Sequence, residues 1–248
     1  MTAENEQDIK GLKAAGKVCA QAMKLMMESV RPGMTTAELD QIGEEFLKKE
    51  GAQSAPRTMY NFPGGTCISI APVIAHGIPG EHVIQDGELI NIDVSAKLGD
   101  YYGDTGSSMV VGKANPEYEK LIEATKNTLM KVLSVAKAGK PLNIIGKTVQ
   151  QEAARLGYNP IYDLTGHGIG KSLHEKPSSV YNFHKPDDRR ALTEGLVLAI
   201  EPFLTTGRGR VVEKSDGWSL RTVDNTIAAQ FEHTVIITKN EPIILTVA

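Results

Sequence analysis

Apolar side chains spaced three and four residues apart predict two helices at the start of the chain. Residues 8–30 follow this spacing, and a Pro-Gly pair closes the segment. A second helix is expected to begin at Thr35, because Thr35 and Glu38 have the spacing of a capping box, and to end near Gly51. The chain therefore opens with two amphipathic helices.

The pattern then changes to short apolar runs separated by glycine and proline, which is typical of strands. The strands expected in the first part of the chain are 67–75, 89–96 and 107–111. Asn115 and Pro116 suit the cap and first turn of a third helix that Gly139 would end, and a fourth helix over 142–156 would stop at Gly157. The later strands are expected at 196–200, 226–231 and 234–238.

This order of elements, two helices and then several strands, occurs twice. We therefore expect an α+β fold made of internally duplicated halves, about 1–114 and 115–248, within a single catalytic domain over 1–248. Identity between the halves is weak, so the interpretation depends on the order of elements.

Composition narrows the function classes. The chain has 248 residues, a net charge of -3 and a pI near 6.1, whereas nucleic-acid and membrane surfaces normally require a basic excess. No apolar run approaches the roughly 20 residues that a bilayer span needs, and no signal peptide is evident. We expect a cytoplasmic protein with no nucleic-acid or membrane partner. Two cysteines are too few for a disulfide framework.

Each half of the sequence contains one histidine followed by two acidic residues. The first half carries His76, Asp93 and Asp104, and the second carries His167, Glu201 and Glu232. Four carboxylates neutralise two divalent ions, and such ions make a bound water lose its proton readily. The residue types alone therefore indicate a di-metal hydrolase in which a bridging hydroxide attacks a carbonyl. An oxygen-rich set with one imidazole suits Co, Mn, Fe(II), Zn or Ni.

Each acid also has a simpler interpretation. Asp93 interrupts an apolar strand, where an unpaired carboxylate is costly, although it could stand on a solvated face. The residues around Asp104 are equally typical of a turn. Asp93 and Asp104 would, however, meet if their two strands form a hairpin. Glu201 and Glu232 could be independent surface acids at strand ends. The metal interpretation is favoured because the four acids occur together.

The histidines differ in their settings. Glycines on both sides of His167 leave its imidazole accessible. His174 and His76 could line the same cleft, where an imidazole can donate a proton or polarise a carbonyl. We therefore expect His167 to be the metal ligand of this group.

At these positions the chain resembles the type I methionine aminopeptidases of the pita-bread fold, in family M24, over almost its whole length. The matching motifs are 75–79, 91–94, 103–105, 165–170, 174–175, 199–202 and 230–234. The resemblance implies antiparallel sheet and flanking helices around a central di-metal site. Its metal ligands would be Asp93, Asp104, His167, Glu201 and Glu232. It also implies that His174 lies near the scissile carbonyl, that His76 lies near the leaving amide, and that Glu201 moves the proton.

The resemblance further implies a pocket for a methionine side chain, with Phe62, Cys67 and Trp218 as walls. Leu173 and Ala75 depart from residues common in the family, which affects the expected pocket shape and not the metal set. For Trp218 ordinary packing remains an equal alternative, and for Cys67 a small core residue is the simpler interpretation.

The implied activity is removal of the N-terminal methionine from nascent polypeptides, at the ribosome or after release, when the second residue is small. We expect a monomer. Three alternatives remain open: an Xaa-Pro aminopeptidase or prolidase, whose members generally carry an additional N-terminal domain; a non-enzymatic binding protein of the same fold, which would be expected to lose ligands; and a metal-free creatinase-like enzyme.

Overall fold

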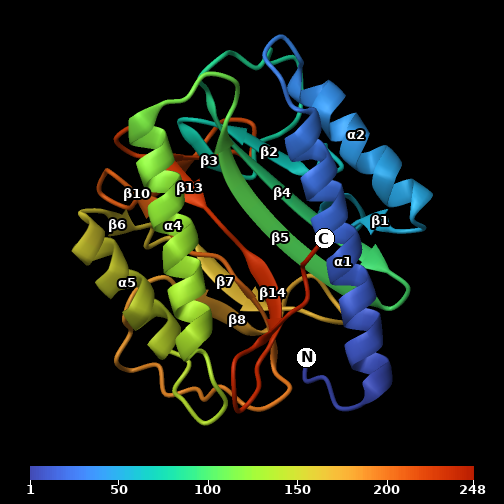
Figure 1. Cartoon of the computed structure of the whole chain (residues 1–248), viewed down its shortest axis with the longest axis vertical. Helices are drawn as coiled ribbons and strands as arrows, with labels where there is room; N and C mark the ends of the chain where they lie inside the picture. The colour runs from blue at the N-terminus through green and yellow to red at the C-terminus, as the bar shows by residue number, and fades with distance from the viewer.

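The computed structural model describes all 248 residues and consists of long helices packed on antiparallel sheets (Figure 1). The helices are α1 (Glu6–Ser29), α2 (Thr36–Lys49), α3 (Ala55–Tyr60), α4 (Pro116–Val135) and α5 (Ile144–Leu156). The first-half strands are β1 (Gln53–Ser54), β2 (Cys67–Ile70), β3 (Val73–Ala75), β4 (Leu89–Leu98) and β5 (Tyr101–Val110). The second-half strands are β6 (Asn159–Pro160), β7 (Thr165–Gly168), β8 (Glu175–Tyr181), β9 (Val197–Ile200), β10 (Phe203–Thr205), β11 (Val211–Glu213), β12 (Leu220–Thr222), β13 (Ala228–Gln230), β14 (His233–Ile236) and β15 (Ile243–Ile244).

The four long helices form where their apolar spacing and caps predict them. Both hydrogen bonds of the capping box between Thr35 and Glu38 are present at the start of α2. The Asn115 side chain caps α4, and Gly157 ends α5 in the left-handed conformation. In Figure 1, α1 and α2 lie together on one side of the molecule and α4 and α5 on the other. None of these helices is long and apolar enough to cross a membrane.

Each helix pair covers sheet through its own hydrophobic core. In the first half, side chains of α1 and α2 such as Met26 and Leu39 pack with Ile90 and Ile92 of β4. In the second half, α4 and α5 pack against β9, β10 and β14 in a separate cluster of buried aliphatic residues. Burial of these apolar faces is the main source of stability for both layers. The molecule thus presents its helices outward and leaves the other sheet faces for a site.

The long hairpin of β4 and β5 is the structural centre of the first half. Its strands pair antiparallel from Leu89 opposite Val110 to Leu98 opposite Tyr101, and β4 also pairs with β1 and β2. The five-stranded sheet of the second half has the order β15-β14-β9-β7-β8. Where the two halves meet, the Glu232 amide donates to the Gly106 carbonyl at 2.9 Å. This junction brings acids of both halves together.

Several expected boundaries are wrong, two of them for identifiable reasons. The strand expected over 67–75 is two strands, because Pro72 has no N–H to donate and the chain turns there. The strand expected at 107–111 begins at Tyr101, because pairing with β4 along its whole length outweighs the turn propensity of its Gly and Asp residues. Helix α4 ends at Val135, ahead of Gly139.

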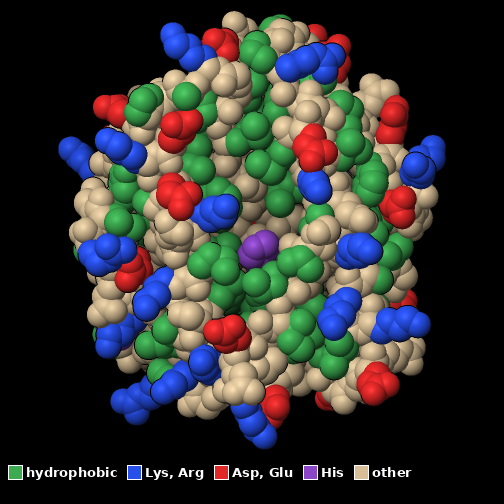
Figure 2. Space-filling model, in the orientation of Figure 1, with side chains coloured by type: hydrophobic (Ala, Val, Ile, Leu, Met, Phe, Trp, Pro, Cys, Tyr) green, Lys and Arg blue, Asp and Glu red, His purple; other side chains and the backbone are tan.

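Charged side chains of both signs are interspersed on the face shown in Figure 2, whereas hydrophobic side chains gather toward its centre. No single-sign patch dominates this face. That distribution agrees with the small net charge of -3.

Candidate metal centre

The β4–β5 hairpin places Asp93 and Asp104 on the same face of the sheet. Asp104 pairs with Ser95, which lies two residues from Asp93 and therefore points to the same side. Asp104 is only 6% exposed, so the alternative that it belongs to a solvated turn is wrong. The expectation that the two acids meet on neighbouring strands is confirmed.

The second half contributes its acids from strand ends beside this hairpin. Glu232 lies between β13 and β14 and is 2% exposed, and Glu201 directly follows β9, where Pro202 stops the ladder. The alternative of two surface acids is therefore wrong for Glu232 and does not describe the largely buried Glu201.

His167 projects from β7. The glycines on either side of it were expected to leave the imidazole accessible, but the structure shows that they are needed for strand packing. A side chain at Gly166 would collide with the Ala199 carbonyl of β9, and one at Gly168 would collide with the Lys176 carbonyl of β8. The glycines therefore let β7 fit between its two neighbours. His167 itself is buried, so the glycines position the imidazole rather than expose it.

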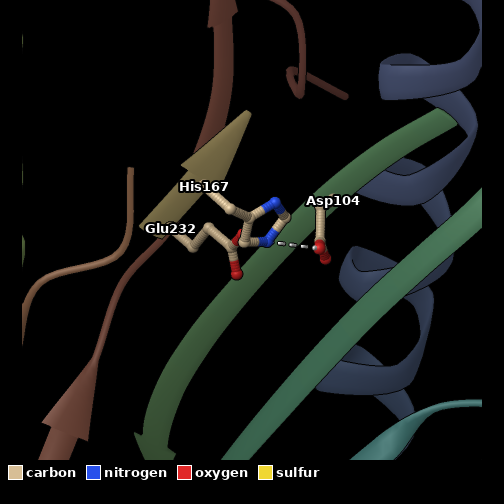
Figure 3. Close-up of side chains that lie close together, drawn as sticks. All are labelled: Asp104, His167 and Glu232. Carbon is tan, nitrogen blue, oxygen red and sulfur yellow. Dashed lines mark ion pairs between the residues drawn. The ribbon is translucent and has the colours of Figure 1, made fainter. Parts of the chain in front are cut away.

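The imidazole of His167 faces the carboxylates through Nε2 (Figure 3). Nε2 lies 3.7 Å from both Asp104 Oδ2 and Glu201 Oε1. Nδ1 lies 3.0 Å from the Gly168 carbonyl, so Nδ1 carries the proton and donates, which leaves the Nε2 lone pair free. One ligand atom each of Asp104, His167 and Glu232 falls within 4.8 Å of the others. This spacing can hold a metal ion.

Two buried oxygens support this interpretation independently. Asp104 Oδ1 and Glu232 Oε1 are inaccessible to solvent and have no hydrogen-bond partner. A buried carboxylate oxygen without a partner is costly, and a divalent cation would satisfy it. The donor set, carboxylate oxygens with one neutral imidazole, fits borderline or hard divalent ions.

Burial and the closeness of the carboxylates also shift the pKa values of these side chains. Burial raises the pKa of Asp93 to about 7. Burial, and then the charges of Glu232, Asp93 and Glu201, hold the pKa of Asp104 well above its usual value. Burial and neighbouring carboxylates likewise raise the pKa of Glu201 and of Glu232, whereas burial lowers the pKa of His167 to about 3. The acids need cations nearby to be ionised together.

Metal binding is expected to stabilise the protein more at pH 7.5 than at pH 5. Without metal, the folded protein retains carboxyl protons that the unfolded chain releases, so the free energy of unfolding falls as pH rises from about 4 to about 7. Bound cations remove this penalty but require ionised ligands. At 100 times Kd, one ion stabilises by about 2.7 kcal/mol, or about 5–10 °C in Tm. Melting curves with chelator or MnCl₂ at both pH values measure this, and an equal shift at both would contradict it.

All the residues predicted from the sequence to form the site line one cavity. Its lining contains the five proposed metal ligands, and the other lining residues are Phe62, Cys67, His76, His174 and Trp218, together with Pro56, Tyr60, Ser95 and Leu173. Phe62 and Trp218 contact edge to face, with ring centroids 5.2 Å apart. Cys67 is partly exposed in this wall, so the interpretation as a simple core residue is wrong.

The two other histidines of the cavity lining, His76 and His174, are more exposed than His167. His76 has a φ of 52°, a left-handed conformation that is uncommon for a residue with a side chain and that holds the imidazole in a fixed direction. The His174 ring lies beside that of His167, with centroids 4.0 Å apart. Partial burial, and then the charge of His76, lower the pKa of His174, which favours a neutral ring.

Two residues of the site were missed from the sequence. Gln230 is buried, accepts from the Asn91 amide at 2.7 Å and donates to Glu232 Oε2 at 3.0 Å, so it orients that carboxylate. A usable signal was its place in the motif 230–234, which also contains Glu232. Tyr60 had no such signal, because the short helix α3 was not expected.

Buried carboxylates around one neutral imidazole, at the end of a partly apolar cavity, are the arrangement of a metal-dependent hydrolase. The chain belongs to metallopeptidase family M24, since the model of that family matches residues 10–239.

Its relatives narrow the class further. The chain is 46% identical to methionine aminopeptidase 2 of Bacillus subtilis (strain 168), with 99% of both chains covered. The crystal structure of methionine aminopeptidase from Rickettsia prowazekii superposes with a TM-score of 0.95 at 35% identity, with both chains fully covered. The prolidase from Pyrococcus horikoshii shares the fold, with a TM-score of 0.79 and 24% identity, but only 63% of that chain is covered. These comparisons confirm the pita-bread fold and the metallopeptidase interpretation, and they favour a methionine aminopeptidase over a prolidase.

Proposed function

We propose that this chain is a methionine aminopeptidase, which hydrolyses the first peptide bond of polypeptides that begin with methionine and have a small second residue. The observation that carries the proposal is the cavity, whose lining combines the apolar side chains of Phe62, Leu173 and Trp218 with the carboxylate cluster. An unbranched apolar side chain can bury its surface on this wall while its own carbonyl reaches the cluster.

The proposed metal ligands are Asp93, Asp104, His167, Glu201 and Glu232, which line the same end of the cavity. Two divalent ions bound there would polarise the scissile carbonyl and lower the pKa of the attacking water. Gln230 holds one oxygen of Glu232 and leaves the other, Oε1, facing the site without a protein partner. The protein therefore supplies a cluster whose ligands are oriented in advance.

The remaining chemistry falls to three side chains. Glu201, whose pKa is raised by burial and by Asp93, is proposed to take the proton of the attacking water and pass it to the leaving amine. His174 is proposed to donate to the carbonyl oxygen as negative charge develops there. His76, held at its unusual backbone angle, is proposed to contact the leaving amide.

The proposed function includes a substrate class, a cellular location and an oligomeric state. We infer that the substrates are nascent polypeptides in the cytoplasm, met at the ribosome or after release, and that the enzyme acts as a monomer. The five ligand positions lie in a cavity that this chain forms by itself, so no second copy is needed to complete the proposed site.

Peptide hydrolysis distinguishes the proposal from its rivals. The protein, loaded with Mn²⁺, is incubated with Met-Ala-Ser and with Ala-Pro-Ser, and free amino acids are measured by mass spectrometry. Free methionine from the first peptide alone is the expected result. Alanine released only from the proline peptide would favour an Xaa-Pro aminopeptidase, and no release from either would favour a binding protein. Glu201→Gln protein prepared in parallel controls for contaminating peptidases.

A further inference from the structure

The hydroxyl of Tyr60 contacts the imidazole of His174 across the cavity. Its oxygen lies 2.6 Å from His174 Nδ1, and the two ring centroids are 5.5 Å apart. Tyr60 is the last residue of α3, and His174 directly precedes β8, so the contact joins segments 114 residues apart. Both side chains line the cavity that contains the proposed metal ligands.

The direction of this hydrogen bond follows from the acidity of its partners. A phenol with an ordinary pKa near 10 is a good donor, and a neutral imidazole nitrogen, with an ordinary pKa near 6.5, is a better acceptor than a phenol oxygen. Tyr60 therefore donates to Nδ1 of His174. A neutral imidazole that accepts at Nδ1 carries its own proton on Nε2.

The Nε2–H group is on the other edge of the ring, away from Tyr60. The ring also contacts His167, whose own Nε2 lies 3.7 Å from the Asp104 and Glu201 carboxylates. His174 is thus held by its Nδ1 and lies beside the proposed ligand His167. In the opposite tautomer, Nε2 would present a lone pair, which repels the negative charge that develops on a carbonyl oxygen.

The loop that carries His174 is fixed separately. The Glu175 carboxylate accepts the backbone N–H groups of Lys171 at 2.6 Å and Ser172 at 2.7 Å. The position of the loop therefore does not depend on Tyr60, whereas the rotation and tautomer of the exposed His174 ring do.

We propose that Tyr60 is a positioning residue for His174: its hydroxyl fixes the ring orientation and the Nε2–H tautomer, so that this N–H is offered to the substrate carbonyl. The proposal rests on the proposed function, because it assigns the donated N–H to the peptide bond being hydrolysed. Tyr60 does not itself contact the reacting atoms.

Replacing Tyr60 with phenylalanine removes the hydroxyl and keeps the ring. Complete loss of an oxyanion donor costs about 10²–10³-fold in kcat, and because His174 remains present, Tyr60→Phe is expected to lower kcat for Met-Ala-Ser about 10-fold, with KM changed less than about 2-fold. Tyr118→Phe makes the same chemical change on α4, outside this cavity, and should retain wild-type kcat. A Tyr60→Phe protein with wild-type kcat would overturn the proposal.

Nitrogen NMR of ¹⁵N-histidine-labelled protein tests the hydrogen bond between Tyr60 and His174 without any measurement of activity. The His174 signals are assigned by their absence from His174→Ala protein. At pH 8, wild-type His174 should show a protonated Nε2 and an unprotonated Nδ1, and in Tyr60→Phe the Nδ1 signal should move to the position of a free acceptor while the His167 signals stay unchanged. A protonated Nδ1 in the wild type would overturn the proposal. A wild type that releases no methionine would instead contradict the proposed function, and the spectra would still decide the pairing.

Discussion

Replacing His167 with alanine is expected to weaken binding of at least one divalent ion by about 100-fold or more and to remove nearly all methionine release. The Nε2 lone pair of His167 faces Asp104 and Glu201 and is left free because Nδ1 donates to the Gly168 carbonyl. Loss of a residue that merely orients a ligand costs 10–100-fold in metal affinity, so loss of a ligand should cost at least the upper end of that range.

Titration calorimetry with Mn²⁺ and turnover of Met-Ala-Ser measure the effect. His184→Ala is a matched control, because His184 is an exposed histidine outside the cavity. Circular dichroism should show that the His167→Ala protein keeps its fold, since the substitution empties a polar cavity wall rather than a hydrophobic core. Near-wild-type turnover at saturating Mn²⁺ would remove His167 from the ligand set.

Glu201→Gln is expected to lower kcat by about 10²–10⁴-fold, the usual contribution of a general acid or base. The glutamine keeps the size of the side chain and one oxygen that can serve as a ligand, but it cannot accept and return a proton. KM should change much less, because the substitution leaves Phe62 and Trp218, the proposed walls of the methionine pocket, unchanged.

Steady-state kinetics with Met-Ala-Ser, combined with calorimetry of Mn²⁺ binding, separates proton transfer from metal loss. Glu194→Gln changes an exposed glutamate that pairs only with Lys239 and should be indistinguishable from wild type. A Glu201→Gln enzyme within about 3-fold of the wild-type kcat would assign the proton transfer to another group. A loss of activity fully restored by excess Mn²⁺ would make Glu201 a ligand alone.

Local signals in the sequence predict much of the fold. The long helices follow from apolar spacing and from caps at Thr35 and Asn115, whose hydrogen bonds the structure contains. The spacing of Asp93 and Asp104 across a glycine turn predicts the hairpin that places them on one face. Residues whose chemistry conflicts with an apolar strand, such as Glu232, mark the site because burial without a partner is costly.

The parts that the sequence does not predict depend on contacts between distant segments. Nothing local to Tyr101 shows that β5 begins there, because the strand exists through its pairing with β4. The junction at which Glu232 meets Gly106 joins the two halves and fixes the metal cluster. The Tyr60–His174 contact spans 114 residues and depends on the six-residue helix α3, which has too few residues for a periodic pattern.

The resemblance suggested the role of each site residue, and the geometry is the physical argument for proposing these roles. His76 and His167 each begin one of the two series of histidine and acids along the chain, yet one is an exposed side chain on a left-handed residue and the other is buried among carboxylates. The repeated series of histidine and acids therefore describes a scaffold with divided roles and not a symmetric cage.

The number of metal ions bound by the wild-type protein tests the central claim most directly. Apo protein is dialysed to equilibrium against increasing Mn²⁺, bound metal is counted by elemental analysis, and Met-Ala-Ser hydrolysis is followed in the same samples. The account predicts saturation at two ions per chain, with methionine release that appears on metal binding and is lost on chelation. Methionine release that persists in metal-free protein, or saturating Mn²⁺ that leaves the chain without bound ions, would contradict it.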